Sequence, residues 1–471
     1  MASVSNLNWP TNRNATPAAQ QVELIAILDN LQSNGYNTVF LQIRPECDAL
    51  YKSSIEPWSY FLTGKQGLAP SIDWDPLEFA ITEAHKRGLD LHAWINPFRA
   101  KQGTAIVLAK NHVSVLHPDW VFNSGTLKML NPGLPEVRNY LISIIEDISK
   151  RYDIDGIHFD DYFYPYTGMS KIKPQDAKTF AENNPKNIST IEDWRRENVN
   201  QLIAGVYDAI QEVNKKFNKN IVFGVSPFGI WKSGAPVGIS GNSSYFTQYC
   251  DPMAWLNAGK VDYLAPQLYW KIKGSQDYVT LSKWWNDQVN ARGKQLYLSN
   301  SYYRMVGNGN WPAKEIQNQI CHNRTTTMNA TFGQIAYSYS MIKENVKGIN
   351  HTLVASEYKY KSFAPPISGK DSILPNKPTA VRIEGTKLKW EVPKPAADGE
   401  IPVKYVVYAF DDLNQALTNQ EDGSKIIDIV AGTELNLPQN LIATKYFVVT
   451  SLDRNNNESG DFSQTIKKAT D

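Results

Sequence analysis

The sequence predicts an α/β protein, a (β/α)8 barrel followed by a small all-β sandwich. The chain has 471 residues, which is more than one ordinary domain. Residues 1–362 alternate short apolar runs with amphipathic helical segments, the pattern of repeated βα units. Prolines gather in a predicted linker at 363–376, and from 377 to 471 the hydrophobic period changes from 3.6 to 2.

Near-continuous apolar runs in the first part predict parallel strands covered on both faces. They are residues 38–43, 89–96, 156–160, 220–226, 262–270, 295–300 and 333–339. Residues 2–6 could supply the end of an eighth strand, which would complete a TIM barrel. An open doubly wound sheet is the alternative. Its nucleotide-binding forms are disfavoured, because no GxGxxG or GxxxxGKS/T motif follows a strand.

Helix signals separate these strands. Thr16-Pro17 can start one helix, and Asp75-Pro76 with Glu78 resembles a capping box that starts another. Apolar residues at three- and four-residue spacing then predict two longer helices, around 137–148 and 199–213.

The last hundred residues predict short strands separated by turns. These strands are residues 381–385, 387–392, 403–410, 425–430, 433–437 and 445–453. Trp390 on an early strand and Tyr446 on the last one resemble fibronectin type III modules, so we expect a fibronectin type III-like sandwich.

Composition narrows the function classes. The formal net charge is +1, which argues against electrostatic binding of nucleic acid. No apolar run is long enough for a membrane span, and the first residues do not have the pattern of a signal peptide. Three widely spaced cysteines predict buried thiols. Aromatic residues make up 11% of the chain, and such rings can form a core or a surface that stacks on sugars.

The predicted active site lies at the C-terminal ends of the barrel strands. The sharpest feature is the segment DGIHFDDYFYPY, in which alternation turns His158 and Asp160 toward the barrel interior. Asp160 could act as a nucleophile or stabilise an oxocarbenium-like transition state, and Asp161 or Asp48 could donate the proton. Glu46 is expected to be an exposed loop residue. We expect a carboxyl separation of about 5–5.5 Å in a retaining enzyme and about 6.5–9.5 Å in an inverting one.

Polar and aromatic side chains at the other strand ends are predicted to bind substrate. These candidates are Arg44, Tyr51, His92, Trp94, Asn96, Arg99, His158, Tyr162, Gln267, Tyr269 and Trp270. His92 and His158 could instead be core histidines. No metal ligand and no cofactor is expected, because the spacing of acids and histidines matches no HExxH or EF-hand pattern.

Several motifs together resemble the glycoside-hydrolase-like family 10 proteins of bacteria. They are NLNWP, QIRPECDALYKSSIEPWS, HAWINPFR, LNPG, DGIHFDDYFYP, GVSPFGIW and DYLAPQLYW, in order over residues 1–350. The resemblance implies a sugar-cleaving or sugar-binding barrel of the cell envelope, secreted, periplasmic or lipid-anchored. It also implies that Arg44, Asp48, His92, Asn96, Arg99, His158, Asp160, Asp161, Gln267 and Tyr269 belong to the site.

Three functions are compatible with this pattern. The first is a glycoside hydrolase acting on a bacterial cell-wall or other polysaccharide, with peptidoglycan glycan strands as one candidate. The second is a non-catalytic carbohydrate-binding barrel, favoured by the lack of an obvious glutamate at a strand end. The third is a metal-dependent hydrolase or deacetylase that uses Asp160, Asp161, His92 and His158.

Overall fold

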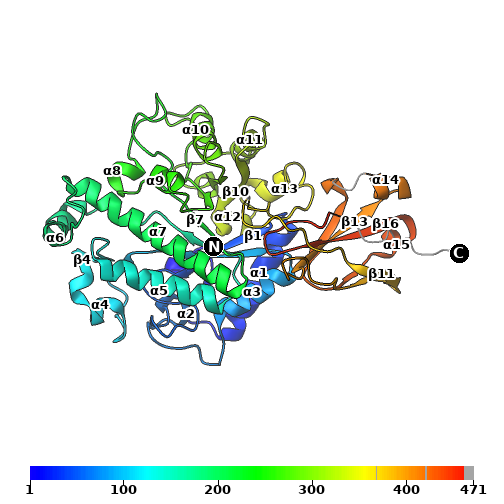
Figure 1. Ribbon diagram of the computed structural model, residues 1–471, viewed down its shortest axis with the longest axis horizontal. Coiled ribbons are helices and arrows are strands. Elements are labelled where there is room, and N and C mark those ends of the chain that lie inside the picture. Colours follow the sequence, from blue (N-terminus) through cyan, green and yellow to red (C-terminus); the bar gives the residue numbers. More distant parts are fainter. Residues whose placement is uncertain (368, 419–421, 461–471) are drawn as a thin grey trace. The chain divides into compact units, whose positions relative to one another are not determined.

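The computed structural model describes residues 1–367, 369–418 and 422–460. The chain forms two compact units. One contains residues 1–26, 40–80 and 92–349, and the other contains residues 27–39, 81–91 and 350–471. Figure 1 shows the helices and strands of both.

A parallel sheet forms the main architecture of the first part of the chain (Figure 1). Its seven strands are ordered as they occur in the sequence, which is the pattern of successive βα units. They are β1 (Thr38–Arg44), β2 (Asp90–Ile95), β6 (Gly156–Phe159), β7 (Val222–Val225), β8 (Tyr263–Leu264), β9 (Gln295–Ser301) and β10 (Thr331–Tyr337). All seven strands coincide with predicted runs, so the mixed α/β class is confirmed.

Two details of this sheet differ from the prediction. Residues 2–6 form no strand: Val4–Asn6 is a 3-10 helix, and only Met1 exchanges backbone hydrogen bonds with β1, through Phe40 and Gln42. Strand β8 is much shorter than the predicted 262–270. Pro266 has no N–H to donate, and beyond it only isolated bridges at Gln267 continue the pairing.

Helices connect successive strands and bury the predicted apolar stripes. The longer ones are α1 (Pro17–Ser33), α3 (Pro76–Lys86), α5 (Pro135–Arg151), α6 (Met169–Glu182), α7 (Ile191–Phe217), α10 (Tyr278–Asn290) and α11 (Ala313–Asn323). Helix α5 buries Val137, Leu141, Ile144 and Ile148 at the expected spacing. It packs on α7 at Gly205, where an added Cβ would lie 2.5 Å from Ile142 Cδ1.

Shorter helices complete this part. They are α2 (Tyr60–Thr63), α4 (Val113–Leu116), α8 (Ser244–Thr247), α9 (Pro252–Asn257), α12 (Tyr339–Lys343) and α13 (Ile349–Val354). A small antiparallel sheet, ordered β3-β5-β4, lies between β2 and α5 in the sequence. Its strands are β3 (Arg99–Lys101), β4 (Val121–Ser124) and β5 (Leu127–Leu130), and the sequence analysis did not predict them.

The C-terminal residues form two antiparallel sheets, ordered β11-β12-β15 and β14-β13-β16. The strands are β11 (Thr379–Glu384), β12 (Lys387–Glu391), β13 (Lys404–Phe410), β14 (Ile426–Val430), β15 (Glu434–Asn436) and β16 (Tyr446–Leu452), and helices α14 (Leu413–Thr418) and α15 (Gln439–Thr444) lie between them. Trp390 and Tyr405 pack edge to face in a core with Val407 and Phe447. The short strands match the prediction, and the fibronectin type III assignment stays a prediction.

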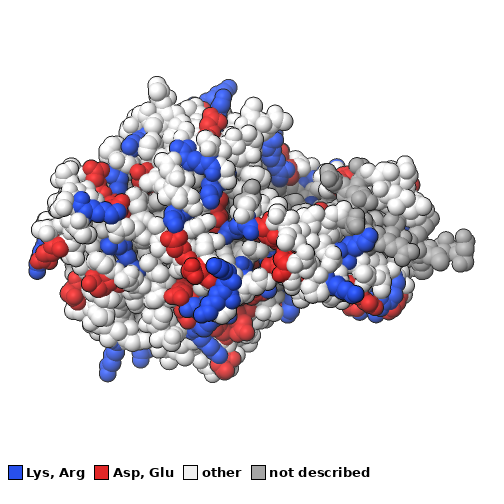
Figure 2. All heavy atoms as spheres, viewed as in Figure 1, with Lys and Arg blue, Asp and Glu red and all other residues white. Residues whose placement is uncertain are grey.

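Charges on the face seen in Figure 2 are mixed, with basic and acidic side chains interspersed. This distribution agrees with the near-zero net charge. Within the described part of the chain, no helix has the length and apolar character that crossing a membrane requires.

Candidate functional site

Asp160 follows directly after β6 and lies among hydrogen-bond donors from a neighbouring strand end. Trp94 Nε1 donates to Oδ2 at 3.0 Å. Asn96 Nδ2 lies 3.2 and 3.1 Å from the two carboxylate oxygens, and the Tyr162 backbone N–H donates to Oδ1 at 3.2 Å. Burial raises the pKa of Asp160 above its usual value, and the Arg99 guanidinium and these donors offset only part of that rise. Donors of this kind stabilise the ionised carboxylate.

Asp161 has a different environment, although it is the next residue. It is 4% exposed and accepts a hydrogen bond from the Tyr166 hydroxyl. Its pKa is raised to about 7, chiefly by burial and in part by the negative charge of Asp160, while hydrogen bonds with Tyr166 and Gln267 partly oppose the rise. Asp161 can therefore hold a proton near neutral pH, while Asp160 is held by donors that favour its charge.

A cleft adjoins this acid pair. Its volume is about 440 Å³, within the range that suits a small ligand. Its walls are mostly aromatic and amide side chains, which suit the C–H faces and hydroxyls of a sugar. The lining residues are Tyr166, Phe228, Ile230, Ser240, Gly241, Asn242, Gln267, Tyr269, Trp270, Gln276, Tyr303 and Arg304. Because Tyr166 and Gln267 also contact Asp161, the cleft and the acid pair form one site.

Arg99 lies on the other side of Asp160. Its Nε donates to the Pro45 carbonyl at 3.1 Å, and its guanidinium lies over the Tyr162 ring. Its Nη2 is buried without a hydrogen-bond partner. A buried guanidinium nitrogen without an acceptor is unfavourable, so Arg99 offers a donor to a bound group.

His92 and His158 are both buried beside Tyr263 and do not line the cleft, and their role in substrate binding stays a prediction. Their Nδ1 atoms lie 2.9 and 3.0 Å from the same Tyr263 hydroxyl, and His158 Nε2 lies 2.7 Å from Ser226 Oγ. Burial lowers the pKa of His158, and the neighbouring His92 lowers it further, so His158 is neutral. Each imidazole is less than one-tenth exposed, so we expect both to hold neighbouring side chains in place rather than to contact a ligand.

Two glycines make room for this interior layer. A Cβ at Gly156 would lie 2.5 Å from His92 Nδ1, and one at Gly224 would lie 2.1 Å from the Tyr263 ring. Both residues are on central strands of the parallel sheet, β6 and β7. The glycines therefore allow the large rings of the neighbouring strands to meet.

Arg44, the last residue of β1, belongs to a buried network with the loop that follows, and its predicted role in substrate binding stays a prediction. Arg44 is fully buried and binds Glu56 through two hydrogen bonds of 2.7 Å. Its Nη1 donates to the carbonyls of Asn96 and Pro97 at 2.6 and 3.0 Å. Tyr51, also predicted to bind substrate, is 1% exposed and lies in the core.

Asp48 is also buried in this loop. Its oxygens accept hydrogen bonds from the backbone N–H groups of Glu46 and Tyr60 and from Gln66 Nε2, at 3.0–3.2 Å. These contacts organise the loop and leave Asp48 no exposed surface. Glu46 was expected to be exposed and is only 1% exposed. Its pKa is raised to about 7, chiefly by burial and in part by the charge of Asp48.

The structure therefore divides the predicted site residues into three groups. Trp94, Asn96, Arg99 and Tyr162 surround Asp160. Gln267, Tyr269 and Trp270 line the cleft beside Asp161. Arg44, Tyr51, His92, His158 and Asp48 are buried among other side chains.

Of the twelve residues that line the cleft, the sequence analysis assigned only Gln267, Tyr269 and Trp270. Among the other nine, Tyr166 and Phe228 follow predicted strands. Tyr303 and Arg304 belong to η3 (Tyr302–Met305), directly after β9. Their position after a barrel strand was the available signal.

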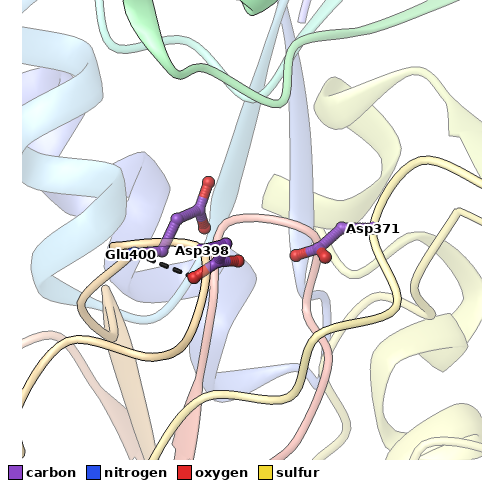
Figure 3. A group of neighbouring side chains, drawn as sticks. All are labelled: Asp371, Asp398 and Glu400. Carbon is purple, nitrogen blue, oxygen red and sulfur yellow. Dashed lines mark hydrogen bonds between the residues drawn. The ribbon is translucent and has the colours of Figure 1, made fainter.

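One acidic group elsewhere has side chains close enough to bind a cation. Asp371, Asp398 and Glu400 each place a carboxylate oxygen within 4.8 Å of the other two, and the Glu400 backbone N–H donates to Asp398 (Figure 3). Among the described residues, the acids and histidines near β6 do not form such a group. Both nitrogens of His158 already have hydrogen-bonding neighbours.

The fold and site define a class: a βα protein with paired carboxyl groups at a strand end and an aromatic cleft beside them. A family model described as glycosyl hydrolase-like 10 matches residues 1–314. The chain therefore belongs to the glycosyl hydrolase-like 10 family.

Named relatives agree with this assignment. The chain is 36% identical to glycosyl hydrolase YngK of Bacillus subtilis over 398 residues, which cover 82% of this chain and 76% of YngK. It is 38% identical to glycosyl hydrolase DigH of Escherichia coli over 327 residues, which cover 65% of this chain and 72% of DigH. Among solved structures, the glycoside hydrolase domain of PgaB from Bordetella bronchiseptica is 14% identical, with a TM-score of 0.46 over 72% of this chain and 93% of that domain.

Proposed function

We propose that this protein is an O-glycosyl hydrolase that cleaves a polysaccharide of the bacterial cell envelope, with peptidoglycan glycan strands as the first substrate to test. The observation that carries this proposal is the difference between Asp160 and Asp161. Asp160 has donors and the Arg99 guanidinium that offset part of the rise that burial causes in its pKa, whereas the pKa of Asp161 is raised to about 7. Glycosidases need one ionised and one protonated carboxyl group at the scissile bond.

In the proposed reaction, Asp161 donates its proton to the glycosidic oxygen as the bond to the anomeric carbon breaks. Asp160 acts on the positive charge that develops at that carbon, as a nucleophile or as an electrostatic stabiliser. Water supplies the hydroxyl group of the new reducing end, and its remaining proton returns to the carboxylate of Asp161. The positive charge of Arg99 stabilises the carboxylate form of Asp160 during the reaction.

The cleft supplies the binding energy in this proposal. Trp270, Tyr269 and Phe228 can stack on sugar faces, and Gln267 and Asn242 can bind hydroxyls. The family assignment and the names of the relatives support a carbohydrate substrate and hydrolysis. We also propose a secreted or envelope location, as the resemblance implied.

The test is release of reducing ends from denuded glycan strands by the purified full chain. We expect Asp160→Asn to reduce kcat by about 10³-fold or more, because it removes the charge at the anomeric centre. We expect Asp161→Asn to reduce kcat by about 10²–10⁴-fold, because the amide cannot donate an acidic proton. Asp119→Asn is the matched control, since Asp119 is exposed on the 3-10 helix Pro118–Trp120.

Wild-type activity in both site variants would contradict the assigned roles. Binding of the strands without any turnover by the wild-type protein would favour the alternative, a non-catalytic carbohydrate-binding barrel.

A further inference from the structure

The cleft beside Asp161 contains one unusual residue, Arg304. Among the described residues that line the cleft, Arg304 is the only one with a formal charge. The others are aromatic, aliphatic, amide or hydroxyl side chains and a glycine. A site that reads only sugar hydroxyls does not require a guanidinium, so its presence needs a separate explanation.

Arg304 has no acidic side chain to neutralise it. Its Nε is buried and has no hydrogen-bond partner, and no salt bridge of the described residues includes it. Its guanidinium carbon lies 5.7 Å from the Tyr303 ring centroid and 5.8 Å from that of Trp311. These rings position the guanidinium without accepting hydrogen bonds in its plane.

A guanidinium with an unsatisfied, buried Nε is costly unless something supplies an acceptor. Its planar set of donors fits a carboxylate through two parallel hydrogen bonds. A single cation also balances a single carboxylate charge. The remaining walls, including Trp270 and Tyr269, suit the body of a sugar ring.

We propose that Arg304 forms a subsite for a sugar residue that carries a carboxylate group. This inference rests on the proposed function, because it assumes that the cleft binds a glycan. If this inference is right, the glycan is acidic. The sugar bound in the cleft then carries a carboxyl group, either on a lactyl ether substituent or as a uronic acid. Arg304 is then a specificity-determining residue, and Asp160 and Asp161 perform the reaction.

The experiment measures binding by titration calorimetry in the Asp160→Asn background, so that ligands are not cleaved. The probes are denuded peptidoglycan oligosaccharides with free lactyl carboxylates, the same oligosaccharides after amidation of those carboxylates, and oligogalacturonates. The variants are Arg304→Met, which keeps much of the length and removes the charge, and Arg304→Lys, which keeps the charge and loses the planar fork.

We expect Arg304→Met to reduce the preference for carboxylated over amidated oligosaccharide by about 10- to 100-fold, the range for loss of a charged hydrogen bond. Arg304→Lys should restore part of this preference. Arg13→Met is the matched control, because Arg13 lies 4.8 Å from the Tyr60 ring and does not line the cleft. Thermal melting of each variant checks that it folds.

An Arg304-dependent preference for the lactyl strands or for oligogalacturonates supports the subsite and identifies the source of the carboxylate. Equal preferences in Arg304→Met and the control would overturn it, as would the absence of binding to all three probes. The proposed function fails separately, if the wild-type protein binds a probe through Arg304 and releases no reducing ends from it.

Discussion

Two acid-bearing loops of this protein, one after β1 and one after β6, use their carboxyl groups in opposite ways. After β1, Arg44 and Glu56 are both buried and form a bidentate pair. After β6, Asp161 faces Tyr166 and Gln267, which line a cleft of about 440 Å³. In the first loop Glu56 is paired with a buried cation, whereas Asp161 in the second has no cationic partner and contacts residues that line a cavity.

This difference shows where chemistry can occur. A carboxylate with a permanent cationic neighbour is held in one protonation state, because its partner stabilises the charge. Asp161 has no such partner, and its pKa of about 7 allows it to gain and lose a proton near neutral pH. The closed loop therefore contributes stability, and the open one is suited to proton transfer.

The largest effect that this comparison predicts is on stability. We expect Arg44→Met to lower the free energy of unfolding by about 3–5 kcal/mol, because it leaves the buried carboxylate of Glu56 without its cation. Urea unfolding measures this change. The double variant Arg44→Met/Glu56→Gln should recover part of the loss, since it removes the unpaired charge. An unchanged urea midpoint in Arg44→Met would show that the pair adds nothing and would remove the contrast with the second loop.

Periodicity predicted most of the fold because strands and helices bury regular stripes. The run 38–43 became β1, and the stripe on α5 is buried at the expected positions. The three-stranded sheet that begins at Arg99 was missed, because strands of three or four residues leave no periodic pattern. The prediction of an eighth strand at residues 2–6 was wrong, because residues 4–6 form a 3-10 helix.

The sequence predicted Asp160 and Asp161 as the acid candidates, because both follow a predicted strand. The alternation of side chains along that strand predicted the direction in which Asp160 points. It could not separate Arg44 from Arg304. Arg44 ends one strand of the parallel sheet and Arg304 follows another, and only tertiary contacts show that Arg44 has an acidic partner whereas Arg304 lines the cleft. Glu46 was predicted to be exposed and is buried. The residues next to it in the sequence do not show which distant segments cover it.

The second prediction concerns the cost of burying Asp161. In the folded protein its pKa is about 7, above the unfolded value of about 3.9. Between these values the unfolded chain releases a proton that the folded protein keeps, so this group lowers stability as the pH rises from about 4 to 7. We expect Asp161→Asn to raise the melting temperature relative to wild type. The increase should grow over that range and level off above it.

Melting curves of both proteins across this pH range provide the measurement, and taking their difference cancels the other titrating groups. A difference that stays constant from acid to neutral pH would contradict the raised pKa of Asp161. The contrast between this loop and the loop after β1 would then no longer hold.

The smallest predicted effect is a shift of one limb of the pH profile. The hydrogen bond from the Tyr166 hydroxyl stabilises the charged form of Asp161 and so lowers its pKa. Tyr166→Phe removes that bond and keeps the ring that packs on Tyr162 and Phe228. If Asp161 is the proton donor, the alkaline limb of kcat/KM should move to higher pH by about one unit, the shift that corresponds to one hydrogen bond.

Tyr245→Phe is the control for this shift, because Tyr245 packs on Trp231 and Phe246 and does not line the cleft. The acid limb should stay in place, since it reports ionisation of Asp160. A loss of activity with both limbs unmoved would mean that Tyr166 only supports the wall of the cleft. The protonated group would then have to be sought elsewhere, first at Glu46, whose pKa is also about 7 and whose Oε2 is buried without a hydrogen-bond partner.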